Sequence, residues 1–188
     1  MKQLSGKFVL RLDPKLHSSL QEFAKRRKLS LNQFCIERLL GNVGQGTEFG
    51  LALLEAISHA LKIYGDELIG IVFFGSWARR EQREGSDIDL LFVLEEGISI
   101  KRELYNQWEE IEENKNYSVQ PSIVALPDGK QPISGFWAEI SIDGIILFET
   151  SNQIHQYLLR VRQAIANGSL KRERSHGQNY WIHESQVA

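Results

Sequence analysis

The stretch FGSWARREQREGSDIDLLFVL, residues 74–94, holds the pattern on which the fold of this chain depends. A Gly-Ser pair is followed by ten mostly polar residues and then by Asp-Ile-Asp, which leads into an apolar run. The apolar stretches 71–74 and 87–94 are typical of strands. Side chains two residues apart on a strand point the same way, about 7 Å apart, so Asp87 and Asp89 are predicted to face one space.

Two carboxylates held this closely repel one another unless a cation lies between them or water screens them. Oxygen ligands around an open site favour Mg²⁺ or Mn²⁺. Gly75 allows the backbone to approach an anion, and Ser76 is predicted to begin a helix whose free amides suit a phosphate. These features together describe a metal that bridges carboxylates and a nucleoside triphosphate. For Asp-Ile-Asp taken alone, the solvated start of a strand is the alternative.

The Gly-Ser pair, the spacing and the Asp-x-Asp before an apolar strand resemble the polymerase-beta-type nucleotidyltransferase superfamily, and in particular its minimal branch. The resemblance covers residues 68–150, and the motif proper covers residues 75–89. It implies a triphosphate of ATP held at Gly75 and Ser76, a phosphate contact from Arg79, and catalytic Mg²⁺ or Mn²⁺ ligands at Asp87 and Asp89.

Two features leave alternatives open. Arg79 has Glu81 and Asp87 nearby in sequence, so an ion pair is the alternative to a phosphate contact. Active members of the superfamily also supply a third carboxylate from a later strand. At the matching place this chain reads SVQPSIVAL, where Gln120 and Ser122 cannot act as a general base. Glu139 is the nearest acidic replacement, and a solvent-facing strand residue is its other interpretation.

Charge is distributed unevenly along the 188 residues. Residues 1–40 carry nine Lys and Arg against three Asp and Glu, a net charge of +6, whereas the rest of the chain carries −8. This asymmetry predicts a small basic module joined to an acidic domain. The expected domains are a module over 1–40, a glycine-rich linker over 41–47, a nucleotidyltransferase domain over 48–170, and a polar aromatic tail over 171–188 that offers a partner contact.

The basic module has the pattern of one strand and two helices. KFVLRL, residues 7–12, alternates polar and apolar side chains, as a half-buried strand does. Asp13 and Pro14 then predict the N-cap and first position of a helix, and Ser30 predicts the cap of a second helix that runs through Leu40. So short a stretch cannot bury enough apolar surface alone, which favours a homodimer through residues 7–40.

This module resembles the ribbon-helix-helix family, in which two chains pair their strands into a ribbon that enters the DNA major groove. The resemblance covers residues 5–40. It implies operator DNA as a partner, with base edges facing Lys7, Val9 and Arg11, and with a phosphate at the turn from Ser30 to Asn32. Val9 departs from the polar residue usual there. A solvated basic face on a dimerisation arm is the alternative.

The rest of the second domain is predicted to mix helices and strands. Helices are expected over 48–64, 100–115 and 152–167. A strand is expected over 118–126, where Pro121 indicates an edge or a bulge. WAEISI and IILFE, residues 137–142 and 145–149, flank Asp143-Gly144 and predict a hairpin. The expected fold is therefore α+β: a ribbon-helix-helix module followed by a polymerase-beta-like nucleotidyltransferase α/β domain with a mixed sheet.

Three classes of function remain open. The minimal branch resembled here implies an antitoxin that transfers AMP from ATP to a tyrosine of a HEPN-type toxin, and the N-terminal module would suit autoregulation. A small-molecule nucleotidyltransferase, such as an antibiotic-modifying enzyme, is the second class, although no distinct substrate domain is visible. The third is a catalytically inactive antitoxin that acts by binding. No apolar run approaches the roughly 18 residues that cross a bilayer, and the N-terminus lacks a signal-peptide core, which predicts a cytoplasmic protein without membrane contact.

Overall fold

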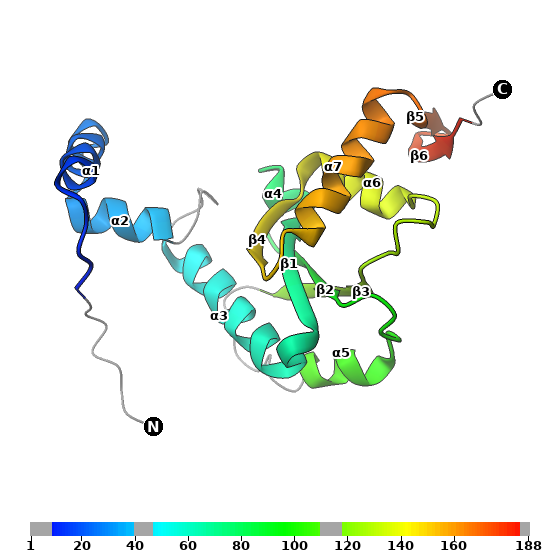
Figure 1. Cartoon of the computed structure of the whole chain (residues 1–188), viewed down its shortest axis with the longest axis horizontal. Helices are drawn as coiled ribbons and strands as arrows, with labels where there is room; N and C mark the ends of the chain where they lie inside the picture. The colour runs from blue at the N-terminus through cyan, green and yellow to red at the C-terminus, as the bar shows by residue number, and fades with distance from the viewer. Residues whose placement is uncertain (1–8, 40–46, 110–117, 185–188) are drawn as a thin grey trace. The chain divides into compact units, whose positions relative to one another are not determined.

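The computed structural model describes residues 9–39, 47–109 and 118–184, and the chain divides into two compact units, Met1–Gly50 and Leu51–Ala188. The described part of the first unit contains α1 (Pro14–Arg26), α2 (Leu31–Leu39) and the start of α3 (Thr47–Tyr64). The second unit contains a four-stranded sheet with helices packed on it and a separate two-stranded hairpin (Figure 1).

The starts of α1 and α2 follow from their capping residues. The Asp13 carboxylate accepts hydrogen bonds from the backbone N–H groups of Lys15 (2.8 Å) and Leu16 (3.4 Å), and Pro14 occupies the first helical position. The Ser30 hydroxyl accepts from the backbone N–H of Gln33 at 3.1 Å. Both predicted caps are therefore confirmed, because each side chain satisfies backbone donors that the first helical turn leaves without partners.

The expected strand over residues 7–12 is not formed in its described part. Residues 9–12 are irregular, and Val9 is 91% exposed. The beginning of the stretch, with Lys7, lies outside the described residues. A strand needs a hydrogen-bonded neighbour, and the described part of this single chain places none beside residues 9–12.

The sheet of the second unit is mixed, as predicted. Its strand order is β3-β2-β1-β4, in which β1 pairs antiparallel with both β2 and β4, and β2 pairs parallel with β3. The parallel pair is joined by a crossover that contains α5 (Arg102–Glu109). The strands span Leu68–Phe74 (β1), Ile88–Leu94 (β2), Val119–Ala125 (β3) and Ile145–Glu149 (β4). Pro121 lies on β3, an edge strand, which confirms the expected position.

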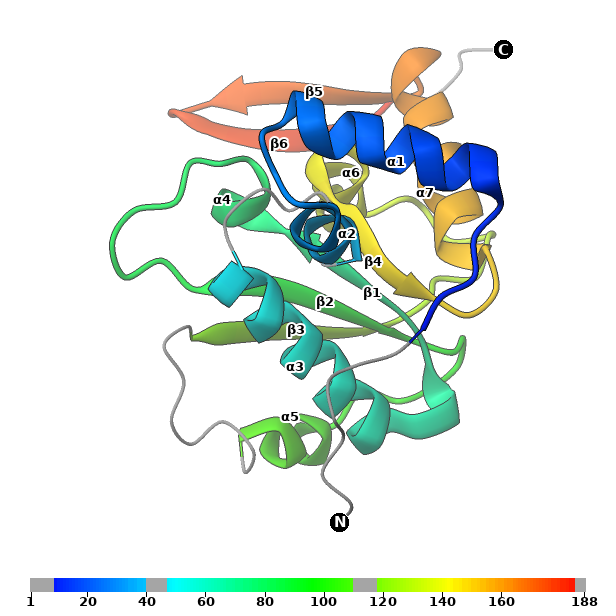
Figure 2. The same cartoon turned by 90° about the vertical axis from the view of Figure 1, so that its left-hand side faces the viewer.

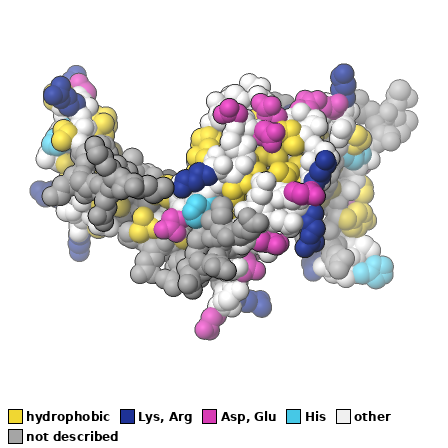
Figure 3. Space-filling view, turned by 90° about the horizontal axis from the view of Figure 1, so that it is seen from below, with side chains coloured by type: hydrophobic (Ala, Val, Ile, Leu, Met, Phe, Trp, Pro, Cys, Tyr) yellow, Lys and Arg dark blue, Asp and Glu magenta, His cyan; other side chains and the backbone are white. Residues whose placement is uncertain are grey.

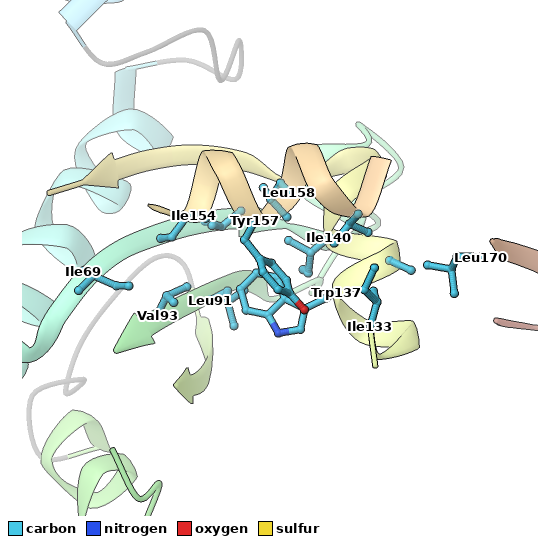
Figure 4. Close-up of a cluster of buried hydrophobic side chains, with 13 residues drawn as sticks. Ile69, Leu91, Val93, Ile133, Trp137, Ile140, Ile154, Tyr157, Leu158 and Leu170 are labelled. Carbon is cyan, nitrogen blue, oxygen red and sulfur yellow. The ribbon is translucent and has the colours of Figure 1, made fainter. Parts of the chain in front are cut away.

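Helices cover both faces of this sheet (Figure 2), which explains why β2 is apolar at every position except Asp89. On one face lie α6 (Gly135–Asp143) and α7 (Gln153–Ala166), whose Trp137 and Tyr157 rings meet edge to face at 5.0 Å over Leu91 (Figure 4). On the other face Phe92 contacts Tyr64 of α3 and Trp108 of α5, with ring centroids 5.6 and 4.9 Å away.

The hairpin predicted at Asp143-Gly144 is wrong, because residues 137–142 belong to helix α6. The Ser134 hydroxyl accepts from the backbone N–H of Trp137 at 3.4 Å and caps the helix. Gly144 has a φ of −66°, whereas the favoured two-residue hairpin turn needs positive φ there. IILFE does form a strand, β4, but it pairs with β1.

A hairpin occurs instead within the segment expected to be a tail. The strands β5 (Leu170–Ser175) and β6 (Gln178–His183) pair antiparallel. Their turn is His176-Gly177, with φ values of 51° and 81°. Positive φ at both central residues is the signature of a type I′ turn, whose twist matches that of the flanking strands.

The surface of the second unit is charged and mixed. Seen from below, acidic and basic side chains are spread among apolar ones on its described part (Figure 3). Among the described residues, no helix has both the length and the apolar character needed to span a membrane.

Candidate active site

The turn from β1 into α4 (Gly75–Ala78) brings the backbone against a carboxylate. Phe74, the last residue of β1, pairs with Asp89 of β2. Gly75 follows with a φ of +77°, and a Cβ on it would lie only 1.9 Å from Asp89 Oδ2. No side chain fits in that space. The turn therefore requires glycine for two reasons: the positive φ disfavours other residues, and any Cβ would clash with Asp89.

Asp89 and Asp87 interact at the mouth of β2. Asp89 is half-buried and accepts a hydrogen bond from the backbone N–H of Ser76. Burial raises the pKa of Asp89 above its ordinary value, and the negative charge of Asp87 raises it further, while Arg79 and the Ser76 bond oppose the rise. Asp87 itself is exposed. The arrangement places two repelling carboxylates beside a backbone turn, which favours a cation that neutralises them.

The segment of ten residues between the Gly-Ser pair and Asp87 is held together by internal hydrogen bonds. Trp77 Nε1 donates to the backbone oxygen of Ser86 at 2.8 Å, and the backbone N–H of Arg83 donates to the Ser86 hydroxyl at 2.9 Å. A cavity of about 440 Å³ opens here, and Asp87 is part of its wall. Its other lining residues are Trp77, Gln82, Arg83, Glu84, Gly85, Ser86 and Ser118. The loop thus leaves space next to Asp87, whereas Asp89 is not among the lining residues.

Arg79 forms two ion pairs. Its Nε donates to Glu81 Oε2 at 2.8 Å, and its Nη1 donates to Asp143 Oδ2 at 2.6 Å. The Glu81 pair is one of the alternatives left open by the sequence. Asp143, the last residue of α6, was not singled out as a functional residue, because it is 64 residues from Arg79 and no local pattern joins them.

The β2–β3 register shows where Gln120 and Ser122 lie, the two residues found where the resemblance implies a third carboxylate. Gln120 pairs with Asp89, and Ser122 pairs with Leu91. Gln120 is therefore the neighbour of the half-buried Asp89 on the next strand. Among the described residues, no group of three or more His, Cys, Asp or Glu side chains is arranged to hold a metal ion.

Glu139 is not a strand residue but lies on α6, where the C-terminal hairpin binds its carboxylate. Trp181 Nε1 donates to Glu139 Oε1 at 2.8 Å, and Arg172 donates to Oε2 at 3.1 Å. A carboxylate that accepts these two bonds is held by the hairpin, which disfavours Glu139 as a base at the Asp87-Asp89 pair.

The residues expected to contact DNA are only partly described. Val9 and Arg11 lie in the irregular segment before α1, and Asn32 is exposed in α2 directly after the Ser30 cap. Lys7 lies outside the described residues.

Two sequence families match the chain. The family described as polymerase beta nucleotidyltransferase matches residues 55–153, and the HicB family matches residues 1–39. A search of curated proteins gave no match.

Three solved structures match a little over half of the chain. A mutant of the toxin–antitoxin MntA–HpeT is 13% identical over 61% of this chain and 88% of its own, with a TM-score of 0.44. A toxin–antitoxin with AMP-PNP is 16% identical over the same shares, with a TM-score of 0.43. A Sulfolobus solfataricus protein described as a nucleotidyltransferase is 20% identical over 56% of this chain and 91% of its own, with a TM-score of 0.32.

These TM-scores are low, so the assignment depends on the family match, which includes the Gly-Ser turn and both aspartates and spans more than half of the 188 residues. The chain belongs to the polymerase beta nucleotidyltransferase family.

Proposed function

We propose that the chain is a metal-dependent nucleotidyltransferase that transfers AMP from ATP to a protein acceptor. The observation that carries the proposal is the contact of the Asp89 carboxylate with the Gly75-Ser76 turn, next to a second carboxylate that raises its pKa. A turn of this kind brings backbone amides and metal ligands close together. A bound triphosphate needs both, because amides donate hydrogen bonds to its oxygens and a metal ion offsets its charge.

The donor set fits magnesium or manganese. Asp87 and Asp89 supply two hard carboxylate groups, and Mg²⁺ is typically bound by one or two carboxylates plus substrate phosphates and water. When bound, the metal would act as a Lewis acid and a template for the phosphates. Arg79 and the Gly75-Ser76 amides are the groups of this chain that we assign to the phosphates themselves.

The site favours a phenolic acceptor. The residue paired with Asp89 on β3 is Gln120, which cannot take a proton from an attacking hydroxyl. A tyrosine hydroxyl, with a pKa of about 10, loses its proton far more readily than water does. In the proposed reaction the phenol oxygen attacks the α-phosphorus of ATP, its proton passes to solvent, pyrophosphate leaves, and AMP becomes esterified to the tyrosine.

The proposed partner is a HEPN-type toxin protein, in line with the resemblance of the motif to the minimal branch of the superfamily. We further propose that the basic N-terminal module binds operator DNA as a homodimer through residues 7–40. In support, the described part of that module leaves large apolar side chains exposed outside the expected DNA-facing positions, among them Leu10, Leu16 and Phe23. A dimer would bury them.

The decisive experiment incubates labelled ATP, Mg²⁺ and the neighbour-encoded partner with the wild type or with Asp87→Asn/Asp89→Asn. The double variant keeps the shape of the site and removes the charge that attracts the metal. We expect a gain of AMP on the partner, measured by mass spectrometry, only with the wild type and only without a chelator. DNA binding by the double variant should be unchanged, because the proposed DNA-binding module is a separate unit, and circular dichroism controls for folding of the second unit.

A second candidate function is neutralisation by binding alone, and the observation that favours it is Gln120 at the place of the third carboxylate. In that case neither protein would modify the partner, and both would still neutralise it.

A further inference from the structure

Arg79 is held by two carboxylates that come from different parts of the chain. Glu81 follows it in the same loop, and its side chain is 64% exposed. Asp143 arrives from the end of α6, and its side chain is only 16% exposed. The second contact is therefore the one that depends on the tertiary fold.

The packing around Gly144 fixes Asp143 in place. A Cβ on Gly144 would lie 2.4 Å from the backbone oxygen of Ile140 and 3.0 Å from Val72 Cγ1, so the chain leaves α6 pressed against β1. The next residue, Ile145, pairs with Phe73 at the end of β1. Asp143 is thus set beside the point where β1 turns into α4, the turn that carries the candidate phosphate contacts.

The two ion pairs leave part of the guanidinium available. Arg79 uses Nε for Glu81 and Nη1 for Asp143, and among the described residues none accepts a hydrogen bond from Nη2. A planar guanidinium bound at two of its three nitrogens has a fixed orientation, and its remaining N–H groups suit a phosphate.

The same contacts keep Arg79 from pairing with the metal ligands. Its charge is near enough to Asp89 to lower the pKa of that carboxyl, yet its hydrogen bonds go to Glu81 and Asp143. An arginine without those partners would be drawn to Asp87 and Asp89, where it would compete with a cation.

We infer that Asp143 is a positioning residue for nucleotide binding: it holds Arg79 beside the Gly75-Ser76 turn, oriented toward a phosphate and off the Asp87-Asp89 pair. The inference rests on the proposed function of that site. Asp143, at the end of α6, lies outside the motif of residues 75–89, so the inference extends the site beyond that motif. It also makes the Arg79–Asp143 ion pair part of the site rather than a link between surface elements.

The test measures two affinities in the full chain: Mn²⁺ alone, by electron paramagnetic resonance, and an ATP analogue with a non-hydrolysable bond in the presence of Mg²⁺, by calorimetry. The variants are Asp143→Asn, Asp143→Glu, Arg79→Ala and the double variant Arg79→Ala/Asp143→Asn. Glu184→Gln, which breaks the exposed Lys171–Glu184 pair on the hairpin, is the matched control.

We expect Asp143→Asn to weaken analogue binding by about tenfold. Losses of this size are typical when a residue is removed that orients a ligand-binding side chain without touching the ligand itself. Asp143→Glu should restore part of the loss, and the double variant should bind the analogue no worse than Arg79→Ala. Mn²⁺ alone should bind more weakly to Asp143→Asn and regain its affinity in the double variant, because the competing cation is then absent. Glu184→Gln should change neither affinity.

Unchanged affinities in Asp143→Asn, or losses from the two single variants that add in the double variant, would overturn the inference while leaving the proposed function intact. A wild type that binds neither Mn²⁺ nor the analogue would overturn both.

Discussion

At the scale of single residues, the sequence predicts the candidate site as far as its contacts are local. Gly75, Ser76, Asp87 and Asp89 fall in one short stretch, and a strand–turn–strand places them together with little freedom. The partner of Arg79 could not be predicted in this way, because Asp143 reaches it through the pairing of β4 with β1.

The raised pKa of Asp89 predicts how the metal-free protein responds to pH. An acid with a higher pKa in the folded state than in the unfolded chain binds more protons when folded. The free energy of unfolding therefore falls as pH rises from the unfolded value, 3.8, through the raised folded value.

Asp89→Asn should abolish this pH dependence and, at neutral pH in a chelator, stabilise the protein slightly, since the side chain is only partly buried. Thermal unfolding over a pH series measures it. Asp66→Asn, at an exposed site, is the control. If Asp89→Asn were less stable than the wild type at every pH of the series, the interpretation that the Asp89 charge destabilises the metal-free protein would be contradicted.

At the scale of elements, the strands buried on both faces were predictable and α6 was not. β1 and β2 have continuous apolar runs because helices cover the sheet on both sides. In WAEISI, the alternation of Ile140, Ser141 and Ile142 matches a strand, but the helix buries Ser141 as well and satisfies its hydroxyl with the Ala138 oxygen at 2.7 Å. Alternation misleads where a small polar residue can be buried by bonding to its own helix.

The hairpin β5–β6 is hydrogen-bonded to α6 through Glu139, and this gives a test at the same scale. Glu139→Gln keeps the size of the side chain but removes the charge that two donors share, at a cost of about 1 kcal/mol. Hydrogen exchange should show faster exchange of the hairpin amides and unchanged exchange in β1 and β2. Glu184→Gln, in an exposed pair, should have a smaller effect. Equal protection of the hairpin in wild type and Glu139→Gln would show that apolar contacts alone attach it.

At the scale of the whole molecule, the chain joins a basic segment to an acidic one. The two compact units and the two family matches divide it in the same region, near the end of the charge-rich N-terminal stretch. Such an arrangement is expected where one part contacts a polyanion and the other an uncharged or basic partner.

Deletion of residues 1–45 should leave α3 and the sheet folded and should abolish binding to a promoter fragment in gel-shift assays. Binding by the full chain should weaken steeply with added salt, because contacts from Lys and Arg release counterions from DNA. Circular dichroism of the truncated protein is the control for folding. A truncated protein that still shifts the fragment would locate DNA binding elsewhere in the chain.

The separation of 64 positions between Arg79 and Asp143 in the sequence also bears on synthesis. When the ribosome has released the chain through β2, both carboxylates proposed to bind the metal and the glycine turn are present, yet Asp143 and β4, the strand that follows it, are still to be made. If chains fold from the N-terminus as they emerge, the order of translation assembles the part of the candidate site proposed to attract a cation before the part proposed to orient the arginine.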